Sequence, residues 1–423
     1  CGEGRNMDVG ACGSGVFRLR ETGPENLRRR PRELTDKKIT IVGAGIGGLA
    51  AAVALRRKGA RVTVLEQAEA ISEVGAGLQI TPNGLAVLQA LDLAEDLAWT
   101  APRARAVVLR SHAKGDEVLR LDLEQYAADL RYYFVHRSDL IGLLADAARQ
   151  EGVKVRLLQK VERVEPGPEP MVHLANGAGC GGDLVIGADG LHSRVRAALN
   201  APRQPFFTGQ VAWRAIVPNH IGLTAEAQVF MGPGRHLVAY PLRDGSIVNL
   251  VAAQERRGWA EEGWNFKDDP DNLRRAFAGF GGDAKDLLDA AEDVALWGLF
   301  RHPVAEHWYG DSMALLGDAA HPTLPFMAQG ANLALEDAWT LCAALEEATD
   351  MQTGLALYQN RRRARAEKVV AAATGNAWKY HLRPPLNWPA HRVLKLAGRL
   401  APQMMVGQFD WIYRHDVTAP QPG

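Results

Sequence analysis

Three glycine-bearing motifs, far apart along the chain, contain residue types suited to holding a nucleotide. They are Gly43-Ala44-Gly45-Ile46-Gly47-Gly48, Gly187-Ala188-Asp189-Gly190, and Gly317-Asp318 with Ala319-Ala320-His321-Pro322 behind it. In the first motif, Gly43 permits a tight turn from strand to helix, Gly45 lets the backbone approach a pyrophosphate, and Gly48 lets helix and strand pack closely. The N-terminus of the following helix offers free N–H groups to phosphates. This motif therefore predicts a dinucleotide site.

Two acidic residues extend that site. Glu66 lies 23 residues after Gly43, at the end of a predicted strand, where a carboxylate accepts hydrogen bonds from a ribose diol. Asp318 follows another predicted strand and precedes a loop that leads to Gly330. There it can hold a ribityl hydroxyl, and a helix that begins at Gly330 can stabilise the negative charge of a reduced flavin ring. These positions favour FAD over NAD, with a helix-capping Asp318 and a turn at Gly330 as the alternative.

His321 has the side chain of a catalytic residue, but it stands beside Pro322 and close to Pro325. Proline restricts φ and stiffens a loop, as a segment that positions a flavin ring requires. We therefore interpret His321 as a structural hydrogen-bonding residue, with a catalytic role as the alternative.

The three motifs, in this order, resemble those of the FAD-dependent single-component aromatic monooxygenases, the class A flavoprotein hydroxylases. The second motif continues as Leu191-His192-Ser193-Arg194. Phe326-Met327-Ala328-Gln329-Gly330-Ala331-Asn332, followed by Leu335-Glu336-Asp337-Ala338, looks most like the salicylate hydroxylase and 3-hydroxybenzoate 6-hydroxylase branch. The resemblance covers about residues 37–375.

The resemblance implies a bound FAD, with NADH or NADPH as a transient co-substrate and O₂ as the oxidant. Arg137 would lie beside the flavin phosphates or ribityl chain, and Asp189 and Arg194 belong to the segment that serves FAD and the nicotinamide cofactor. For both arginines, a position without cofactor contact is the alternative. The expected cofactor contacts are Gly43, Gly45, Ile46, Gly47, Gly48, Glu66, Gln67, Arg137, Asp189, Asp318, Gly330, Ala331 and Asn332.

In the resembled family, a flavin C4a-hydroperoxide transfers OH to an aromatic ring, and this transfer is faster when a ring hydroxyl is deprotonated. Period-two alternation puts His236 and Tyr240 on one face of a predicted strand, and a histidine with a pKa near neutrality suits proton abstraction. In the resembled branch, a His and a Tyr with this spacing line the substrate pocket. We expect His236, and then Tyr240, as catalytic residues, with a structural strand histidine and a core tyrosine as alternatives. Arg214 could pair with a substrate carboxylate, although a structural salt bridge is preferred.

The elements that position these residues follow from the hydrophobic pattern. Short apolar runs predict buried parallel strands, at Ile39–Val42, Arg61–Leu65, Asp183–Ile186 and Met313–Leu316. Period-two alternation predicts an antiparallel sheet, over Val211–Val217, Gln228–Tyr240 and Ser246–Ala252. Helical spacing predicts helices at Gly45–Lys58, Gly330–Glu347 and Gly354–Ala373. Asp244-Gly245 is a signal for a type I′ hairpin.

The predicted fold class is α/β: a Rossmann-like FAD-binding domain with a parallel sheet, an inserted antiparallel-sheet substrate domain and C-terminal helices. Residues 1–36 are expected to be a disordered or artefactual extension. The FAD-binding domain is expected to be discontinuous, at 37–105, 130–200 and 300–375, with the substrate domain at 106–129 and 201–299. Residues 376–423 are expected to form a helical segment packed over the first domain.

The amino-acid composition limits the classes of partner and the cellular location that the sequence supports. The 49 basic and 49 acidic residues cancel, which gives no electrostatic support to a nucleic-acid or anionic-membrane partner. The basic run Arg361-Arg362-Arg363 is interpreted as a solvated helix face. The four cysteines match no zinc or redox spacing, so we expect no metal and a reduced, cytoplasmic location, with a Cys180–Cys342 pair as the alternative. The oligomeric state is open, with a homodimer as one option.

The function that these observations favour is an NAD(P)H- and FAD-dependent aromatic monooxygenase of the EC 1.14.13 type. Its expected substrate is a small hydroxybenzoate- or hydroxypyridine-like acid. One alternative is a flavin hydroxylase or epoxidase for a larger isoprenoid or polyketide, with the C-terminal tryptophans lining a channel. Another is a flavin-binding protein without oxygen chemistry.

Overall fold

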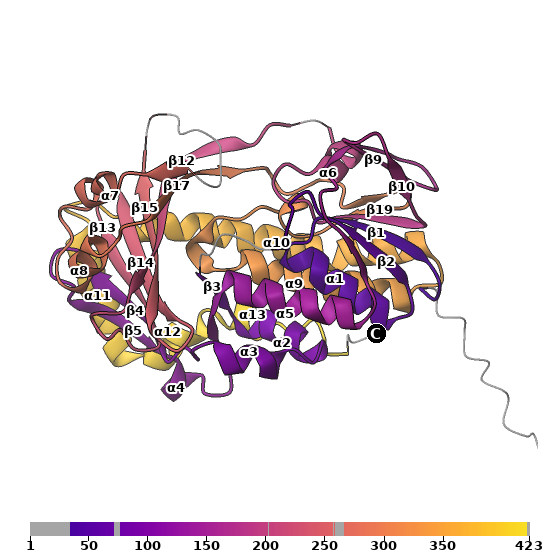
Figure 1. Cartoon of the computed structure of the whole chain (residues 1–423). Coiled ribbons are helices and arrows are strands. Elements are labelled where there is room, and N and C mark those ends of the chain that lie inside the picture. The colour runs from indigo at the N-terminus through magenta and orange to yellow at the C-terminus, as the bar shows by residue number, and fades with distance from the viewer. Residues whose placement is uncertain (1–33, 72–76, 202, 257, 259–265, 421–423) are drawn as a thin grey trace, which may run out of the picture.

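Two large sheets lie at opposite ends of the chain's fold, and long helices run between them (Figure 1). A computed structural model describes residues 34–71, 77–201, 203–256, 258 and 266–420. The expected N-terminal extension, including Cys1 and Cys12, lies outside the described residues except for residues 34–36. In that short stretch Leu34 is buried in the core, and the Asp36 N–H donates to the Gly59 carbonyl.

The first sheet has six strands in the order β18-β19-β11-β1-β2-β7. They are Lys38–Val42 (β1), Arg61–Leu65 (β2), Lys154–Arg156 (β7), Leu184–Gly187 (β11), Tyr309–Gly310 (β18) and Met313–Leu315 (β19). All neighbours are parallel except β18 and β19. The apolar runs predicted four of these strands, and β1 and β11 are almost wholly buried, as expected of strands with both faces covered.

Three helices build the layer that positions the first motif. Helix α1 (Ile46–Arg57) connects β1 to β2 and packs against α5 (Arg137–Gln150) and α9 (Gly330–Glu347). Helix α10 (Met351–Tyr380) packs along α9 and extends beyond its predicted end at Ala373. Smaller elements complete this part: β3 (Gly77–Ile80), α2 (Pro82–Ala90), α3 (Ala94–Thr100), β6 (Tyr133–His136), β8 (Val161–Glu165), β9 (Met171–Leu174), β10 (Gly179–Gly181), α6 (Arg194–Leu199), and the 3₁₀ helices η1 (Gly317–Ala319) and η2 (Pro325–Met327).

The second sheet has eight strands in the order β16-β17-β12-β15-β14-β13-β4-β5. They are Ala106–Ser111 (β4), Glu117–Asp122 (β5), Phe206–Pro218 (β12), Glu226–Gly232 (β13), Arg235–Leu242 (β14), Ile247–Glu255 (β15), Phe266–Asp268 (β16) and Val294–Arg301 (β17). All neighbours are antiparallel except β13 and β4. Helices α7 (Pro270–Ala276) and α8 (Asp283–Asp289) cover one face, which leaves the other face for the site.

The single alternating run predicted over Gln228–Tyr240 is wrong, because the structure divides it into β13 and β14. The chain reverses at Pro233-Gly234, where Gly234 has a φ of +67°, a conformation that glycine adopts without strain. The division does not move His236 and Tyr240, which both lie on β14.

The β14–β15 hairpin forms, but its predicted type I′ turn is wrong. The register pairs Leu242 with Ile247, so the connection has more residues than the two of a type I′ loop. Positive φ angles occur at Arg243 and Gly245 rather than at two adjacent positions. The Asn219 side chain braces this turn by donating to the Gly245 carbonyl at 2.7 Å.

The C-terminal helices do not lie where the sequence suggested. Helices α11 (Asn387–Leu400) and α12 (Pro402–Gly407) pack against β5, and α12 also contacts α4 (Leu123–Tyr126). They thereby cover the edge strand of the eight-stranded sheet, which would otherwise expose unpaired backbone groups. The short α13 (Asp410–Tyr413) contacts α2 in the first part, and Val417 behind it packs against the first core. In the part of the chain that the structure describes, no helix is both long and apolar enough to span a membrane.

Candidate active site

The glycine turn between β1 and α1 is shaped by close backbone approaches. A Cβ on Gly43 would lie 2.4 Å from the Ala188 carbonyl oxygen, and one on Gly48 would lie 2.1 Å from the Gly43 carbonyl oxygen. Both positions therefore demand glycine. A Cβ on Gly45 would meet no atom of the described residues within 4 Å, and Gly45 is the N-cap of α1, without a side-chain cap. This open space at a helix N-terminus is a suitable place for a pyrophosphate.

The other predicted residues of this motif brace the turn. The Glu66 carboxylate accepts hydrogen bonds from the Ala44 N–H at 2.8 Å and the Ala68 N–H at 2.9 Å, and the neighbouring Gln67 is exposed. Ile46 is buried, and a Cβ on Gly47 would lie 2.6 Å from the Leu316 side chain. Ile46 and Gly47 thus face the core, and only their backbone groups are available to a phosphate.

The second motif supports the first and connects it to the third. The Asp189 carboxylate accepts from the Ser193 hydroxyl at 2.5 Å and from the Arg194 N–H at 2.7 Å, so it holds the start of helix α6, whose N-cap is Ser193. Burial raises the pKa of Asp189, although these hydrogen bonds oppose the shift. The Arg194 side chain is exposed. Sequence reasoning missed Arg196, which is buried and donates to the Ala319 carbonyl at 3.1 Å.

The third motif lies opposite the start of α5. Asp318 is in η1, directly after β19, and Arg137 is the first residue of α5. Burial lowers the pKa of Arg137, and the charge of Asp318 opposes this shift. The structure therefore brings together two predicted cofactor residues that are far apart in the sequence.

Three predicted cofactor residues lie at the start of α9, and the first two of them are accessible to a cofactor. Gly330 and Ala331 are half-buried, and the helix has no side-chain cap. The Asn332 side chain is fully buried and already engaged, because it donates to the Gln79 and Ala328 carbonyls at 2.9 and 2.7 Å and accepts from the Thr81 N–H at 3.0 Å. Asn332 thus holds the helix start in place, and only its backbone is available to a cofactor.

A buried ion cluster lies beneath the third motif. The Asp337 carboxylate accepts from His321 at 2.5 Å, from the Gly317 N–H at 2.9 Å and from Arg362 at 2.7 Å. Burial alone would raise the pKa of Asp337, but His321 and Arg362 lower it to about 2. His321 is thus a buried hydrogen-bonding residue, as the structural interpretation expected, and its ring shares the Asp337 carboxylate with the Gly317 N–H.

The interpretation of the basic run as a solvated face is wrong for Arg362, whose side chain is 1% exposed. Arg362 bonds to Glu336 as well as Asp337, and Glu336 also accepts from Arg365 at 2.7 Å and from Asn83 at 2.6 Å. The charge of Arg362 is stable in the core because two carboxylates neutralise it. Glu336 and Asp337 were part of the resemblance, but only the fold pairs them with this arginine.

The sheet face that carries His236 and Tyr240 is turned toward the loop after the third motif. Leu324 and Phe326 of that loop pack on this face, and the ring centroids of His236 and Phe326 are 5.0 Å apart. His236 is fully buried, and no hydrogen-bond partner is found for its Nε2 among the described residues. Burial lowers the pKa of His236 well below 6.5, and the neighbouring His381 lowers it further. The imidazole is therefore neutral at neutral pH, and its lowered pKa makes it a weaker base than the histidine with a pKa near neutrality that the sequence suggested.

Tyr240 lies on the same face. It is 3% exposed, and its ring stacks on Phe134 with centroids 5.1 Å apart. Burial raises the pKa of Tyr240, and the charge of Arg214 opposes the shift. Its hydroxyl therefore keeps its proton at neutral pH and can only donate or accept a hydrogen bond, which makes Tyr240 a candidate for orienting a substrate.

Arg214 joins this face through strand pairing. It pairs with Val251, which pairs with Val238, the residue between His236 and Tyr240. Its guanidinium carbon lies 3.7 Å from the centre of the Trp297 ring, and burial lowers its pKa to about 9. The preferred structural salt bridge is absent from the described residues, and the buried Arg214 Nε has no hydrogen-bond partner among them. Arg214 is thus a half-buried cation with a buried Nε, and it is suited to an anionic ligand.

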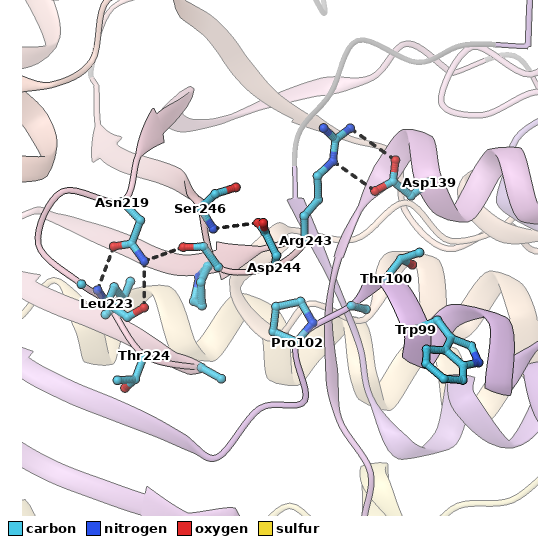
Figure 2. A pocket seen from close by; sticks show the side chains of 15 residues that line it. Trp99, Thr100, Pro102, Asp139, Asn219, Leu223, Thr224, Arg243, Asp244 and Ser246 are labelled. Carbon is cyan, nitrogen blue, oxygen red and sulfur yellow. Dashed lines mark hydrogen bonds and ion pairs between the residues drawn. The ribbon is translucent and has the colours of Figure 1, made fainter.

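A surface cavity of about 1020 Å³ lies elsewhere, beside the β14–β15 turn. Figure 2 shows that its polar groups satisfy one another, since Arg243 pairs with Asp139 and Asn219 bonds to Leu223. None of the predicted site residues lines it, so we assign it no part in the chemistry. The described residues also contain no cluster of side chains able to hold a metal ion.

The geometry fits FAD: an open helix start at Gly45 for the pyrophosphate, Arg137 and Asp318 together, and a second open helix start at Gly330. The FAD-binding domain family matches residues 36–373. The chain is 35% identical to 3-amino-4-hydroxybenzoate 2-monooxygenase of Streptomyces cremeus, over 82% of this chain and 88% of that protein. It is 33% identical to 6-hydroxynicotinate 3-monooxygenase of Pseudomonas fluorescens, over 81% and 91%. A salicylate hydroxylase substrate complex shares the fold, with a TM-score of 0.77 and 23% identity, over 90% of this chain and 96% of that one. The chain therefore belongs to the FAD-dependent class A flavoprotein hydroxylases.

Proposed function

We propose that this protein hydroxylates a small aromatic acid that carries a ring hydroxyl, using NAD(P)H and O₂. Bound FAD would supply the reduction of O₂ and the transfer of one oxygen atom. The observation that carries the proposal is a pair of buried nitrogens on one sheet face, Arg214 Nε and His236 Nε2, which have no hydrogen-bond partner within the described part of the chain and lie opposite Phe326. A cation and a neutral base on one surface suit a ligand with a carboxylate and an acidic hydroxyl.

The spacing supports a small substrate. Arg214 lies on β12 and His236 on β14, with β15 between them, and the two positions are offset by two residues along the strands. By ordinary sheet dimensions their Cα atoms are about 12 Å apart. Both side chains extend from the same face, so a single-ring acid could bridge their nitrogens. In this arrangement Arg214 holds the carboxylate, His236 takes the proton of the ring hydroxyl, and Tyr240 orients the ring.

We infer the cofactor contacts from the same geometry. The pyrophosphate would occupy the open side of the glycine turn, and Arg137 and Asp318 would flank the ribityl region. The proposed contacts are Gly43, Gly45, Ile46, Gly47, Gly48, Glu66, Gln67, Arg137, Asp189, Asp318, Gly330, Ala331 and Asn332. For Ile46, Gly47 and Asn332 the proposed contact is through the backbone.

The relatives support the substrate class. Their names specify 3-amino-4-hydroxybenzoate, 6-hydroxynicotinate and 3-hydroxybenzoate as substrates, each a single-ring acid with a ring hydroxyl. The alternative of a larger isoprenoid or polyketide depended on tryptophans lining a channel. Trp378 and Trp388 are instead 68% and 63% exposed at the surface, which favours the small acid.

The test is a screen of the purified holoenzyme with phenolic and heteroaromatic acids. NADH or NADPH oxidation, hydroxylated product and released peroxide are measured together. We expect an acid to stimulate coenzyme oxidation with product formed, and its decarboxylated analogue to do so poorly. A flavin-containing protein that no aromatic acid stimulates would support the non-catalytic alternative and contradict the proposal.

We further infer a homodimer and a cytoplasmic location. The homodimer is supported by exposed apolar side chains on and next to α11, including Trp388, Leu396 and Leu400. Light scattering of the purified protein tests it, and a monomeric mass at working concentration would contradict it. The cytoplasmic location is supported by the free thiols of Cys180 and Cys342, and cell fractionation tests it.

A further inference from the structure

Three ionisable side chains form a continuous hydrogen-bonded chain from the buried sheet face to the protein surface. His236 Nδ1 lies 2.7 Å from His381 Nε2, and His381 Nδ1 lies 3.1 Å from a carboxylate oxygen of Glu255. His236 and His381 are buried, whereas the Glu255 side chain is 41% exposed. The chain thus begins at the candidate base and ends in solvent.

The fold holds these three residues in line. Glu255 is the last residue of β15, on the same face as His236, because Ala253 of β15 pairs with His236 and alternate residues share a face. His381 follows directly after α10, and its carbonyl accepts from the Gly234 N–H at 3.1 Å. Helix α10 therefore delivers His381 to the end of the sheet by a backbone bond to the β13–β14 turn.

The carboxylate at the outer end determines where each proton sits. Partial burial would raise the pKa of Glu255, but hydrogen bonds from Arg383 and His381 outweigh it and hold the pKa below its ordinary value. An ionised carboxylate accepts only, so His381 must carry its proton on Nδ1 and present a bare Nε2. His236 must then donate from Nδ1 to that Nε2. This leaves His236 Nε2 without a proton, facing the candidate substrate site.

We propose that His381 and Glu255 form a proton relay that sets the tautomer of His236 and carries the substrate proton to solvent. The inference rests on the proposed function and deepens it. The hydroxyl O–H bond breaks as a bond to His236 Nε2 forms, the Nδ1 proton of His236 passes to His381 Nε2, and the Nδ1 proton of His381 passes to Glu255. No electron is gained or lost in these steps, and the proton leaves from Glu255 to water.

The surroundings explain why a lone histidine would not suffice. A proton retained on His236 would leave a cation in an apolar site between Phe326 and Tyr380, with ring centroids at 5.0 and 5.2 Å, and burial disfavours such a charge. The charged groups that act on His381 are Glu255, Arg383 and Arg235. Only Glu255 among them can accept a proton, and it lines a surface cavity of about 690 Å³ together with Arg383.

The tautomers can be tested without any substrate. Holoenzyme with ¹⁵N-labelled histidine is studied by long-range N–H correlation NMR, with the His236 and His381 signals assigned by substitution of each with Gln. We expect both rings to carry their proton on Nδ1, and Glu255→Ala to abolish that preference at His381. A proton on Nε2 of His236 in the unmodified holoenzyme would overturn the relay.

The proton transfer is tested by stopped-flow mixing of oxidised holoenzyme, without NAD(P)H, with 3-amino-4-hydroxybenzoate and a pH-indicator dye. Glu255→Gln keeps an oxygen acceptor for His381 but cannot take the proton. We expect phenolate formation and proton release to slow at least about tenfold, with little change in the Kd of the probe. Glu124→Gln, which removes another surface carboxylate paired with an arginine, should behave as wild type.

Each outcome separates the relay from the proposed function. Proton release at the wild-type rate in Glu255→Gln, or no release when the probe binds, would overturn the relay while the hydroxylase proposal stands. If 3-amino-4-hydroxybenzoate does not bind, the NMR measurement of the histidine tautomers decides the relay, because it needs no substrate. Failure of the substrate screen, with the predicted tautomers present, would instead contradict the substrate assignment.

Discussion

Replacing Arg214 with methionine should remove recognition of the substrate carboxylate while preserving the packing of the sheet face. The guanidinium carbon of Arg214 lies 3.7 Å from the centre of the Trp297 ring, and a methionine side chain of similar length can keep that contact. No acidic side chain among the described residues pairs with Arg214. The substitution therefore deletes one charge without exposing an opposite one.

The size of the effect follows from the burial of that charge. A pKa lowered from 12.5 to about 9 corresponds to a net penalty of about 4–5 kcal/mol for the cation at this site, and a bound carboxylate would offset part of it. Hydrogen bonds to charged groups contribute about 1.5–3 kcal/mol, and truncating one partner of a buried pair costs about 2–5 kcal/mol. We expect the Kd of an aromatic acid to rise by about 30- to 1000-fold, the equivalent of about 2–4 kcal/mol.

The assay compares 3-hydroxybenzoate with phenol, using the change in flavin absorbance of oxidised holoenzyme on binding. Arg214→Met should weaken binding of the acid alone, because phenol has no carboxylate to lose, and phenol should bind as well as before or better. Arg214→Lys should retain part of the discrimination, and Arg243→Met, which removes a surface arginine paired with Asp139, should have no effect. Equal losses for the acid and phenol, or no loss for either, would refute the assignment of Arg214.

Three further predictions rest on other parts of the structure. Gly45→Ala should leave the thermal unfolding temperature of the FAD-free protein unchanged, since its Cβ meets no atom of the described residues within 4 Å, but it should weaken FAD binding. Gly48→Ala should destabilise the FAD-free protein, because its Cβ would lie 2.1 Å from a carbonyl oxygen. Calorimetry without FAD and flavin titration test both variants, and equal effects on folding would contradict this. Arg362→Met should cost about 3–5 kcal/mol of unfolding free energy, because it leaves the carboxylate of Asp337 buried without its cation, and a denaturant curve that matches wild type would be evidence against the buried ion cluster. His236→Gln should reduce kcat/KM by about 10²- to 10⁴-fold. The folded-state pKa of His236 lies below 6.5, so the unfolded state binds more protons below that pH. The stability of the wild type should therefore fall as the pH drops below 6.5, and His236→Gln should lack this component. Superimposable pH–stability profiles of the two proteins would contradict this expectation.

Local sequence patterns predicted much of the fold because they report backbone requirements. The apolar runs of β1 and β2 and the glycines between them specify a strand–helix–strand unit, since only glycine fits where Gly43 and Gly48 touch other backbone atoms. Helix α9 begins and ends at the predicted residues, Gly330 and Glu347. Alternation placed His236 and Tyr240 on one face without knowledge of the sheet, because side chains along a strand have a period of two.

Long-range pairing, by contrast, cannot be read from local patterns. Arg362 has the sequence context of a solvated helix, yet it is buried because α10 packs along α9 and meets Glu336 and Asp337. The C-terminal helices carry no local signal that directs them to the edge of β5 rather than to the first sheet.

The sequence by itself determined the cofactor class and the candidate base, because glycine geometry and strand periodicity are local properties. Only the tertiary structure decided which charges are neutralised: among the residues that the structure describes, Arg214 has no acidic partner, whereas Arg362 has two. It also joined His236 to Glu255 through His381, a residue 145 positions away in the sequence. Burial and charge pairing depend on which distant segments pack together, and that is why they emerge only with the folded chain.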